Sequence, residues 1–135
     1  MSISMGVKLR GPKKAKILII EDEPMLQEAY RHVLTFTGYK VVVAGDGNEG
    51  LELLKKHRPK VILLDVLMPH LDGRDFLKQA GIRKHYPETR VIACSNLSDQ
   101  KTSDFMLEHG ADRVVLKSDL SPSQLVELIE ELCSQ

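Results

Sequence analysis

The sequence predicts an α/β protein with a doubly wound (βα)5 fold, in which a five-stranded parallel sheet carries helices on both faces. Five short apolar runs rich in β-branched residues recur at intervals of about 20 to 30 residues, and such runs are typical of strands buried on both faces. The segments between the runs have apolar residues at a spacing of three and four, with helix start and stop residues at their ends. Strict alternation of strand and helix favours parallel pairing through right-handed crossovers.

The five strands are expected at residues 17–20, 41–44, 61–64, 91–94 and 114–116. The first two of the helices between them have clear start and stop residues. The first helix begins at Pro24, a residue favoured in the first helical turn, and ends at Gly38. Its apolar stripe consists of Leu26, Ala29, Tyr30, Val33 and Leu34. Asp46 and Glu49 have the pattern of a capping box for the second helix, which ends before Pro59.

The last three helices are expected to begin at side chains that accept hydrogen bonds from free backbone N–H groups. Asp72 is the expected cap of the third helix, and Ser98 that of the fourth, which ends at Gly110. Ser121 and Gln124 form a capping-box pattern for the fifth helix. Its core face is expected to consist of Leu125, Leu128, Ile129 and Leu132.

Length and charge indicate one domain with a basic extension. The chain has 135 residues, which is the size of a single domain. Its formal net charge is zero, but residues 1–16 carry five Lys and Arg residues and no acid, so the rest of the chain has an excess of five acids. We expect residues 1–14 to form a disordered basic tail and residues 15–135 to form the folded domain.

The sequence favours a cytoplasmic protein that has no membrane partner. Cys94 and Cys133 are too few for a disulfide framework, which fits a reducing compartment. No apolar run has the length of a signal peptide core near the N-terminus or of a membrane-spanning helix elsewhere.

Polar side chains stand where four of the expected strands end. Glu21 and Asp22 follow the first strand and Asp65 follows the third, while Ser95 and Lys117 follow the fourth and fifth. Any one of them alone is as well explained as a helix cap or a surface residue. Parallel strands, however, bring their carboxyl ends to one edge, which is where such sheets bind ligands. Clustered carboxylates favour Mg²⁺, and an amine and a hydroxyl beside them can bind phosphoryl oxygens.

The chain resembles the receiver domains of two-component response regulators. The resemblance rests on the segments 17–23 (ILIIEDE) and 61–73 (VILLDVLMPHLDG, with a D-x-x-M-P-x-x-x-G pattern), together with Ser95 and Lys117 at matching intervals. It covers residues 15–133 and implies the flavodoxin-like, CheY-like form of the doubly wound fold.

The resemblance also implies a role for each residue at the strand ends. Asp65 would accept a phosphoryl group from a histidine kinase or a phosphotransfer protein. Apart from this self-phosphorylation, the resemblance implies no enzyme activity. Mg²⁺ or Mn²⁺ would be held by Asp22, Glu21, Asp65 and the backbone carbonyl of Leu67. Phosphoryl oxygens would be bound by Ser95 and Lys117, in agreement with the needs of phosphoryl transfer.

Signalling is expected to occur through protein contacts. In receivers the responsive surface consists of the fourth helix, the fifth strand and the fifth helix, which here would include Lys101, Phe105, Arg113 and Val114. Its partner would be a downstream protein or a second copy in a homodimer, and no direct binding to DNA is expected.

Four departures from the family pattern predict altered behaviour. Val114 replaces the usual switch aromatic and is stiff and short. The peptide before Ser118 is expected to be trans, because a cis bond before a residue other than proline costs about 2.5 to 4 kcal/mol. Asn96 is larger than the small residue that is usual there. Leu67 and Leu97, at positions that tune hydrolysis, cannot orient a water, so we predict slow autodephosphorylation.

Three interpretations of the function stay open, and two others are disfavoured. The chain is expected to be a stand-alone receiver, since it ends with the fifth helix. The alternatives are a receiver-like docking domain that is not phosphorylated and a receiver fragment of a larger response regulator or hybrid kinase. An aspartyl-phosphate phosphatase would need an acid at Leu67, and a dinucleotide site would need a glycine-rich turn in place of Glu21 and Asp22.

Overall fold

The sheet has the predicted parallel topology. The structure is a computed structural model that describes residues 15–68, 70–96 and 99–134. Within these ranges the strands are β1 (Lys16–Ile20), β2 (Lys40–Ala44), β3 (Val61–Asp65), β4 (Arg90–Ser95) and β5 (Arg113–Leu116). They lie in the order β2-β1-β3-β4-β5, and every neighbouring pair is parallel. Each strand extends the expected apolar run by one or two residues.

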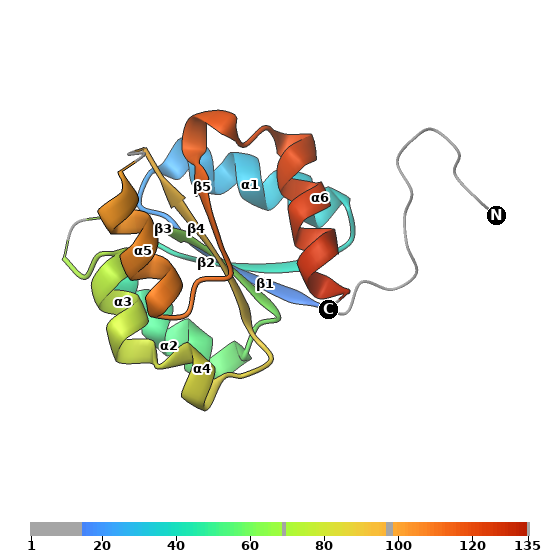
Figure 1. Cartoon of the computed structure of the whole chain (residues 1–135). Coiled ribbons are helices and arrows are strands. Elements are labelled where there is room, and N and C mark those ends of the chain that lie inside the picture. Colours follow the sequence, from blue (N-terminus) through green and yellow to red (C-terminus); the bar gives the residue numbers. More distant parts are fainter. Residues whose placement is uncertain (1–14, 69, 97–98, 135) are drawn as a thin grey trace.

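Helices cover both faces of this sheet. They are α1 (Pro24–Phe36), α2 (Gly47–His57), α3 (Gly73–Ala80), α4 (Ile82–His85), α5 (Gln100–Glu108) and α6 (Pro122–Cys133). A 3-10 turn, η1 (Lys117–Asp119), connects β5 with α6. In Figure 1, α1 and α6 lie on one face of the sheet, and α2, α3, α4 and α5 lie on the other.

Two apolar cores result from the alternation of side chains along each strand. In β1, Ile17 and Ile19 pack on the side of α1 and α6, whereas Leu18 and Ile20 pack on the side of α2 to α5. All four side chains are completely buried, and burial of a side chain of this size stabilises the fold by about 1.5 to 3 kcal/mol. The strands therefore form a rigid platform whose ends carry the polar residues.

Most of the predicted helix starts are confirmed. Pro24 occupies the first turn of α1, and the carboxylate of Asp72 accepts the N–H groups of Arg74 and Asp75. Ser121 and Gln124 form the complete capping box of α6. Asp46 caps α2, but the box is not closed there, because the Glu49 carboxylate accepts the N–H of Gly45 instead. Leu128 of the expected core face of α6 is half-buried.

Three expectations need correction or fall outside the described residues. The cap of α5 is Asp99, which accepts the N–H of Thr102; Ser98 itself lies outside the described residues, as does Leu97. Ala29 is exposed, because it lies at the solvent edge of the α1 stripe. The one-turn helix α4 was not expected, since four residues are too few to show a helical period.

Two further predictions concern the chain before Ala15 and the peptide before Ser118. Residues 1–14, the predicted tail, lie outside the described residues, so its disorder stays a prediction. The Lys117–Ser118 peptide is trans, as predicted, and begins η1. Within the described ranges, none of the helices combines the length and the apolarity that crossing a bilayer requires.

Candidate functional site

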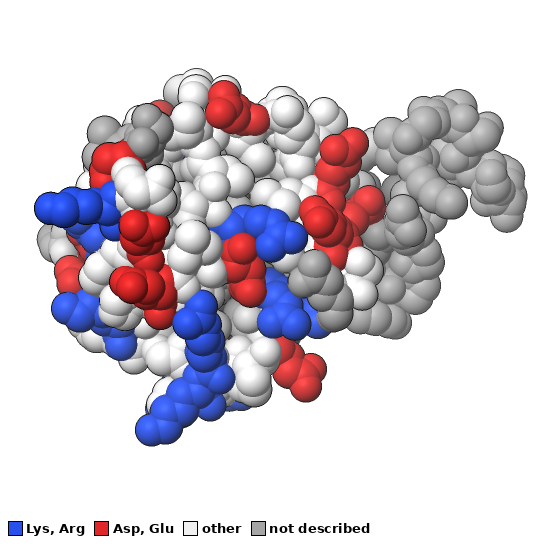
Figure 2. All heavy atoms as spheres, viewed as in Figure 1, with Lys and Arg blue, Asp and Glu red and all other residues white. Residues whose placement is uncertain are grey.

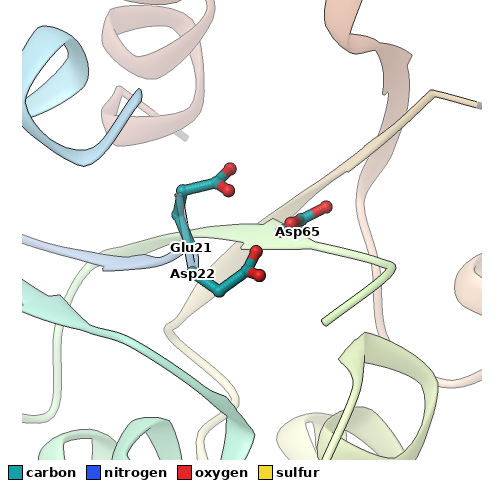
Figure 3. A group of neighbouring side chains, drawn as sticks. All are labelled: Glu21, Asp22 and Asp65. Atoms are coloured by element: carbon teal, nitrogen blue, oxygen red, sulfur yellow. The ribbon is translucent and has the colours of Figure 1, made fainter. Parts of the chain in front are cut away.

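The site lies at the carboxyl ends of β1 and β3, where the strand order reverses. β1 pairs with β2 on one side and with β3 on the other, with Ile20 opposite Leu64. Glu21 and Asp65 therefore stand at the same level, one residue beyond this pair. Figure 3 shows the carboxylates of Glu21, Asp22 and Asp65 around one common space. This crevice is where doubly wound sheets bind their ligands.

The three carboxylates are close together and differ in exposure. One oxygen from each of Glu21, Asp22 and Asp65 lies within 4.8 Å of the others. The Glu21 and Asp65 residues are 2% and 5% exposed, whereas Asp22 is exposed. Like charges at this separation and in this degree of burial repel each other strongly unless a cation compensates them.

Lys117 provides part of that compensation from the first residue of η1. Its Nζ lies 2.9 Å from Oε1 of Glu21 and 3.2 Å from Oδ2 of Asp65, and its side chain is 12% exposed. The structure thus brings the predicted phosphoacceptor, one predicted metal ligand and the predicted phosphoryl-binding amine into direct contact.

The electrostatics of this cluster shift two pKa values. Burial raises the pKa of Asp65 from its ordinary 3.8 to about 7, and the Glu21 carboxylate adds to the rise while Lys117 opposes it. Burial disfavours the charged form of Lys117, but its hydrogen bond to Glu21 and the charges of Asp65 and Glu21 outweigh that effect and raise its pKa. Asp65 is therefore a carboxylate whose charge is incompletely compensated by the protein.

The donor set fits a hard divalent cation. With all three carboxylates ionised against one ammonium group, two negative charges are left over. Carboxylate oxygens are the ligands that Mg²⁺ prefers, and it typically keeps several waters. Glu21, Asp22 and Asp65 are the residues that would hold it. Leu67 lies two residues beyond Asp65 in the β3–α3 loop and is 45% exposed, and its carbonyl stays a predicted ligand.

Close backbone contacts fix the start and the end of the loop that follows Asp65. The Gly73 N–H donates to the carbonyl of Val66 at 2.8 Å, and the Gly47 N–H donates to that of Leu71 at 3.0 Å. A Cβ on Gly73 would stand 2.6 Å from the carbonyl oxygen of Asp65, closer than real Cβ atoms come. The last glycine of the 61–73 motif is thus required by this close approach, a role that the motif alone did not indicate.

Three further contacts hold Glu21 in place, and no sequence pattern indicates them. The Gln27 side chain donates from Nε2 to the backbone carbonyl of Glu21, and the Glu23 N–H donates to Oε2 of Glu21 at 3.1 Å. The Glu21 N–H in turn donates to the carbonyl of Ala44 at 3.0 Å. Both ends of this residue are therefore fixed before any cation binds.

The predicted switch residues lie on the neighbouring strands. Ser95 ends β4, is 1% exposed and stands opposite Leu116 of β5. Val114 is half-buried and packs, with Phe105 of α5, against the core on that face. Ser95 is thus next to the strand that leads into Lys117, while Leu97 lies outside the described residues.

Comparisons with known proteins agree with this geometry. The family model described as "Response regulator receiver domain" matches residues 17–130. The probable C4-dicarboxylate response regulator DctR of Bacillus subtilis (strain 168) is 41% identical over 107 residues, which are 78% of this chain and 46% of that protein. The probable transcriptional regulator ycf27 of Porphyridium aerugineum is 35% identical over 113 residues, which are 84% of this chain and 45% of that protein. The chain thus spans about half the length of these curated relatives.

Solved structures with a similar fold include response regulator receivers. A CheY-like response regulator receiver domain protein from Methanospirillum hungatei JF-1 has a TM-score of 0.83 at 27% identity, with 90% of this chain and 95% of that chain covered. The chemotaxis protein CheY4 of Vibrio cholerae has a TM-score of 0.81 at 27% identity, with 88% and 98% covered. With the strand-end acids and the lysine in place, this chain belongs to the response regulator receiver domain family.

Proposed function

We propose that the protein accepts a phosphoryl group on Asp65, in a Mg²⁺-dependent reaction, from a histidine kinase or a phosphotransfer protein. The observation that carries the proposal is the contact of Lys117 with both Asp65 and Glu21, beside the carboxylate of Asp22. A nucleophilic oxygen, a divalent cation site and a positive charge are the parts that phosphoryl transfer requires.

The residues divide the chemistry among them. A carboxylate oxygen of Asp65 forms the new O–P bond while the P–N bond of the donor phosphohistidine breaks, and the leaving imidazole keeps the electron pair and takes up a proton. Lys117 is placed to exchange its contact with the Asp65 carboxylate for a contact with a transferred phosphoryl oxygen. A bound Mg²⁺ supplies charge neutralisation for that group. Ser95 is the proposed hydroxyl donor to a further oxygen.

Intact mass after treatment with acetyl phosphate tests the site. In Mg²⁺ the wild type is expected to gain the mass of one phosphoryl group, and Asp65→Asn is expected to gain none because amides do not attack. Asp75→Asn, at an exposed carboxylate on α3, is the matched control and is expected to behave like the wild type. No mass gain in the wild type, in Mg²⁺ or Mn²⁺, would favour the docking domain that is not phosphorylated.

The proposed output surface consists of α5, β5 and α6. Phe105 and Val114 pack against the core behind it, and Arg113 of β5 lies 3.4 Å from Glu131 of α6. A hollow of about 460 Å³ between α3 and α5 is lined in part by Lys101 and Phe105. These contacts link the strand before Lys117 to a surface that a downstream protein or a second copy can bind.

Assembly on this surface is tested with beryllofluoride, a phosphoryl mimic. Size-exclusion chromatography with Mg²⁺ is expected to show either a homodimer or, with the downstream protein, a complex that forms only in the activated state. Phe105→Ala is expected to weaken that complex while the phosphoryl uptake of Asp65 is retained. A complex that is indifferent to beryllofluoride would contradict the proposed output.

Slow autodephosphorylation is part of the same proposal. The exposed side chain of Leu67 offers no group that orients a water, and Leu97 is also apolar. The phosphorylated state is expected to persist for minutes or longer in Mg²⁺, and Leu67→Gln is expected to shorten its half-life. Leu107→Gln, at an exposed apolar residue on α5, is the control. A half-life of seconds in the wild type would contradict this part.

Location and chain context follow from the proposed chemistry. A kinase-driven switch with only two cysteines in its sequence, Cys94 and Cys133, fits the cytoplasm. The stand-alone arrangement stays a prediction, because the curated relatives are about twice as long as the matched segment. The mass of the protein isolated from its own cells tests it against a receiver within a larger regulator.

A further inference from the structure

The amino-terminal edge of the sheet carries a row of bases, one at or directly before the start of each of four neighbouring strands. Lys16 stands opposite Lys40 in the β1–β2 pair. The Lys60 N–H donates to the carbonyl of Lys16 at 2.9 Å, and the Arg90 N–H donates to that of Lys60 at 2.8 Å. The row therefore runs across the sheet in the order Lys40, Lys16, Lys60 and Arg90, at the end opposite to Asp65.

Helix ends add further bases around this row. The last turn of α2 holds Lys55, Lys56 and His57, and α4 holds Arg83, Lys84 and His85. Figure 2 shows Lys and Arg side chains gathered at the lower end of the molecule, where Figure 1 places α4. In the sequence, four more bases precede Ala15, at Lys8, Arg10, Lys13 and Lys14.

A hollow of about 580 Å³ opens within this basic edge. Lys16, Arg58 and Lys60 line it, together with Tyr86, Glu88 and Thr89. The Arg58 guanidinium lies over the Tyr86 ring at 4.6 Å and donates to the carbonyl of His85 at 3.1 Å. These contacts hold the guanidinium in one orientation at the rim, so that an anion meets a positioned cation.

The cations of this hollow form no ion pair within the described part of the chain, and Glu88 is the one acid in its lining. No ion pair involves Lys16, Arg58 or Lys60 among the described residues, and Nζ of Lys16 contacts Nδ1 of His57 at 3.4 Å. Lys16, Arg58 and Lys60 thus offer donors and positive charge that no carboxylate of the described residues takes up in an ion pair.

Acids limit the length of a bound polyanion. Glu108 ends α5, Asp112 precedes β5 and Glu131, which pairs with Arg113, lies in the last turn of α6, all toward the β5 side of the same edge. A long nucleic acid that crossed the edge would meet Glu108 and Asp112, whereas a short acidic segment in the hollow, beside the carboxyl ends of α2 and α4, would not reach them. We propose that the hollow at Lys16, Arg58 and Lys60 is a docking site for a short acidic peptide segment of a partner protein.

Binding of an octaglutamate peptide to the full chain tests the proposal. Fluorescence anisotropy at low salt measures affinity, and amide shifts in NMR spectra locate the peptide. The double variant Arg58→Gln/Lys60→Gln is expected to bind roughly tenfold more weakly, because each partly exposed charge pair contributes a few-fold. Arg31→Gln/Lys78→Gln, at exposed bases on α1 and α3, removes the same charge and is expected to change affinity less than about twofold. The basic tail is identical in both variants.

Four results would overturn the assignment. They are absence of octaglutamate binding, equal weakening in both double variants, tighter binding of octathymidylate than of octaglutamate, and self-association abolished by Arg58→Gln/Lys60→Gln. The second would mean charge without a site, the third a nucleic-acid surface and the fourth a second copy as occupant. Phosphoryl uptake on Asp65 is measured in each variant, so that failure here is distinguishable from failure of the proposed function.

Discussion

The two ends of the sheet carry opposite charges held in different ways. At the carboxyl end, Glu21 and Asp65 are almost completely buried and share one ammonium group. At the amino end, Lys40 is exposed while Lys16 and Lys60 are half-buried, and the charges are spread along the row. Charges in the first arrangement are only weakly screened by solvent, whereas those in the second are screened by water and salt.

This difference indicates what each end can respond to. A crowded, buried cluster responds strongly to a proton, a cation or a phosphoryl group, because each changes the balance at short range. A spread, solvated row changes little in stability and acts instead on the approach and orientation of a charged partner. The change in unfolding free energy caused by a substitution in the carboxylate cluster should therefore depend on pH and Mg²⁺. The change caused by a substitution at the amino end should not.

The largest effect is expected from Lys117→Met. Removal of one partner from a buried ion pair leaves uncompensated charge and typically costs about 3 to 5 kcal/mol. Here Glu21 and Asp65 would both lose their cation. Denaturant unfolding in EDTA at alkaline pH measures the loss, and added Mg²⁺ is expected to reduce it. Equal losses with and without Mg²⁺ would contradict a cation site at these carboxylates.

The next largest effect is expected from a substitution that disturbs the backbone packing around the carboxylate cluster. Gly73→Ala is expected to destabilise the protein by about 3 kcal/mol, because overpacking in a rigid site costs energy of this order. The new Cβ would stand 2.6 Å from the carbonyl oxygen of Asp65 and 2.9 Å from Cα of Val66, both backbone atoms. Gly45→Ala is the control, since its Cβ would meet side-chain atoms at 3.7 Å or more. Similar thermal midpoints for the two variants would contradict the close approach.

Asp65→Asn is expected to stabilise the metal-free protein by an amount on the order of 2 kcal/mol at pH 8. The pKa of Asp65 is 3.8 in its ordinary state and about 7 in the fold. For an acid whose pKa is raised on folding, the cost of ionisation is absent below pH 4, grows as the pH rises to 7 and is complete above it.

Thermal unfolding of Asp65→Asn and wild type from pH 4 to 8 measures this dependence. The difference between them should be smallest at pH 4 and largest at pH 8 in EDTA, and Mg²⁺ should reduce it. A difference that is constant with pH would show that burial and Glu21 do not disfavour the Asp65 carboxylate.

Sequence patterns predicted one end of the sheet better than the other. Asp65 and Lys117 stand out because each directly follows an apolar run, and the topology of parallel strands then places them together. Lys16, Lys40, Lys60 and Arg90 directly precede the apolar runs in the same way. The sequence pattern does not single them out, since a surface lysine is common and no known chemistry requires a row of bases at this position.

Other features could not be predicted because they depend on distances between segments. Gln27 reaches the carbonyl of Glu21 only because α1 begins where it does. Ser98 and Asp99 are both good caps, and adjacent residues of this kind give the sequence no means of choosing between them. The fold itself was predicted closely, because a continuous β-branched run favours a buried strand and an apolar stripe at a spacing of three and four favours a helix.

The smallest effect is expected at the amino end, in Thr89→Val. Thr89 is 6% exposed, and its hydroxyl donates to the carbonyl of Pro59 at 2.8 Å beside the basic hollow. Loss of one such bond at constant shape costs about 1 kcal/mol, and no titrating group takes part in it. The loss should therefore be the same in Mg²⁺ and in EDTA and at pH 5 and pH 8, unlike that of Lys117→Met.

Thr35→Val, at an exposed residue of α1, is the control and should leave the unfolding free energy almost unchanged. A Mg²⁺-dependent loss in Thr89→Val would mean that the two ends of the sheet are energetically coupled, and the contrast between them would then fail.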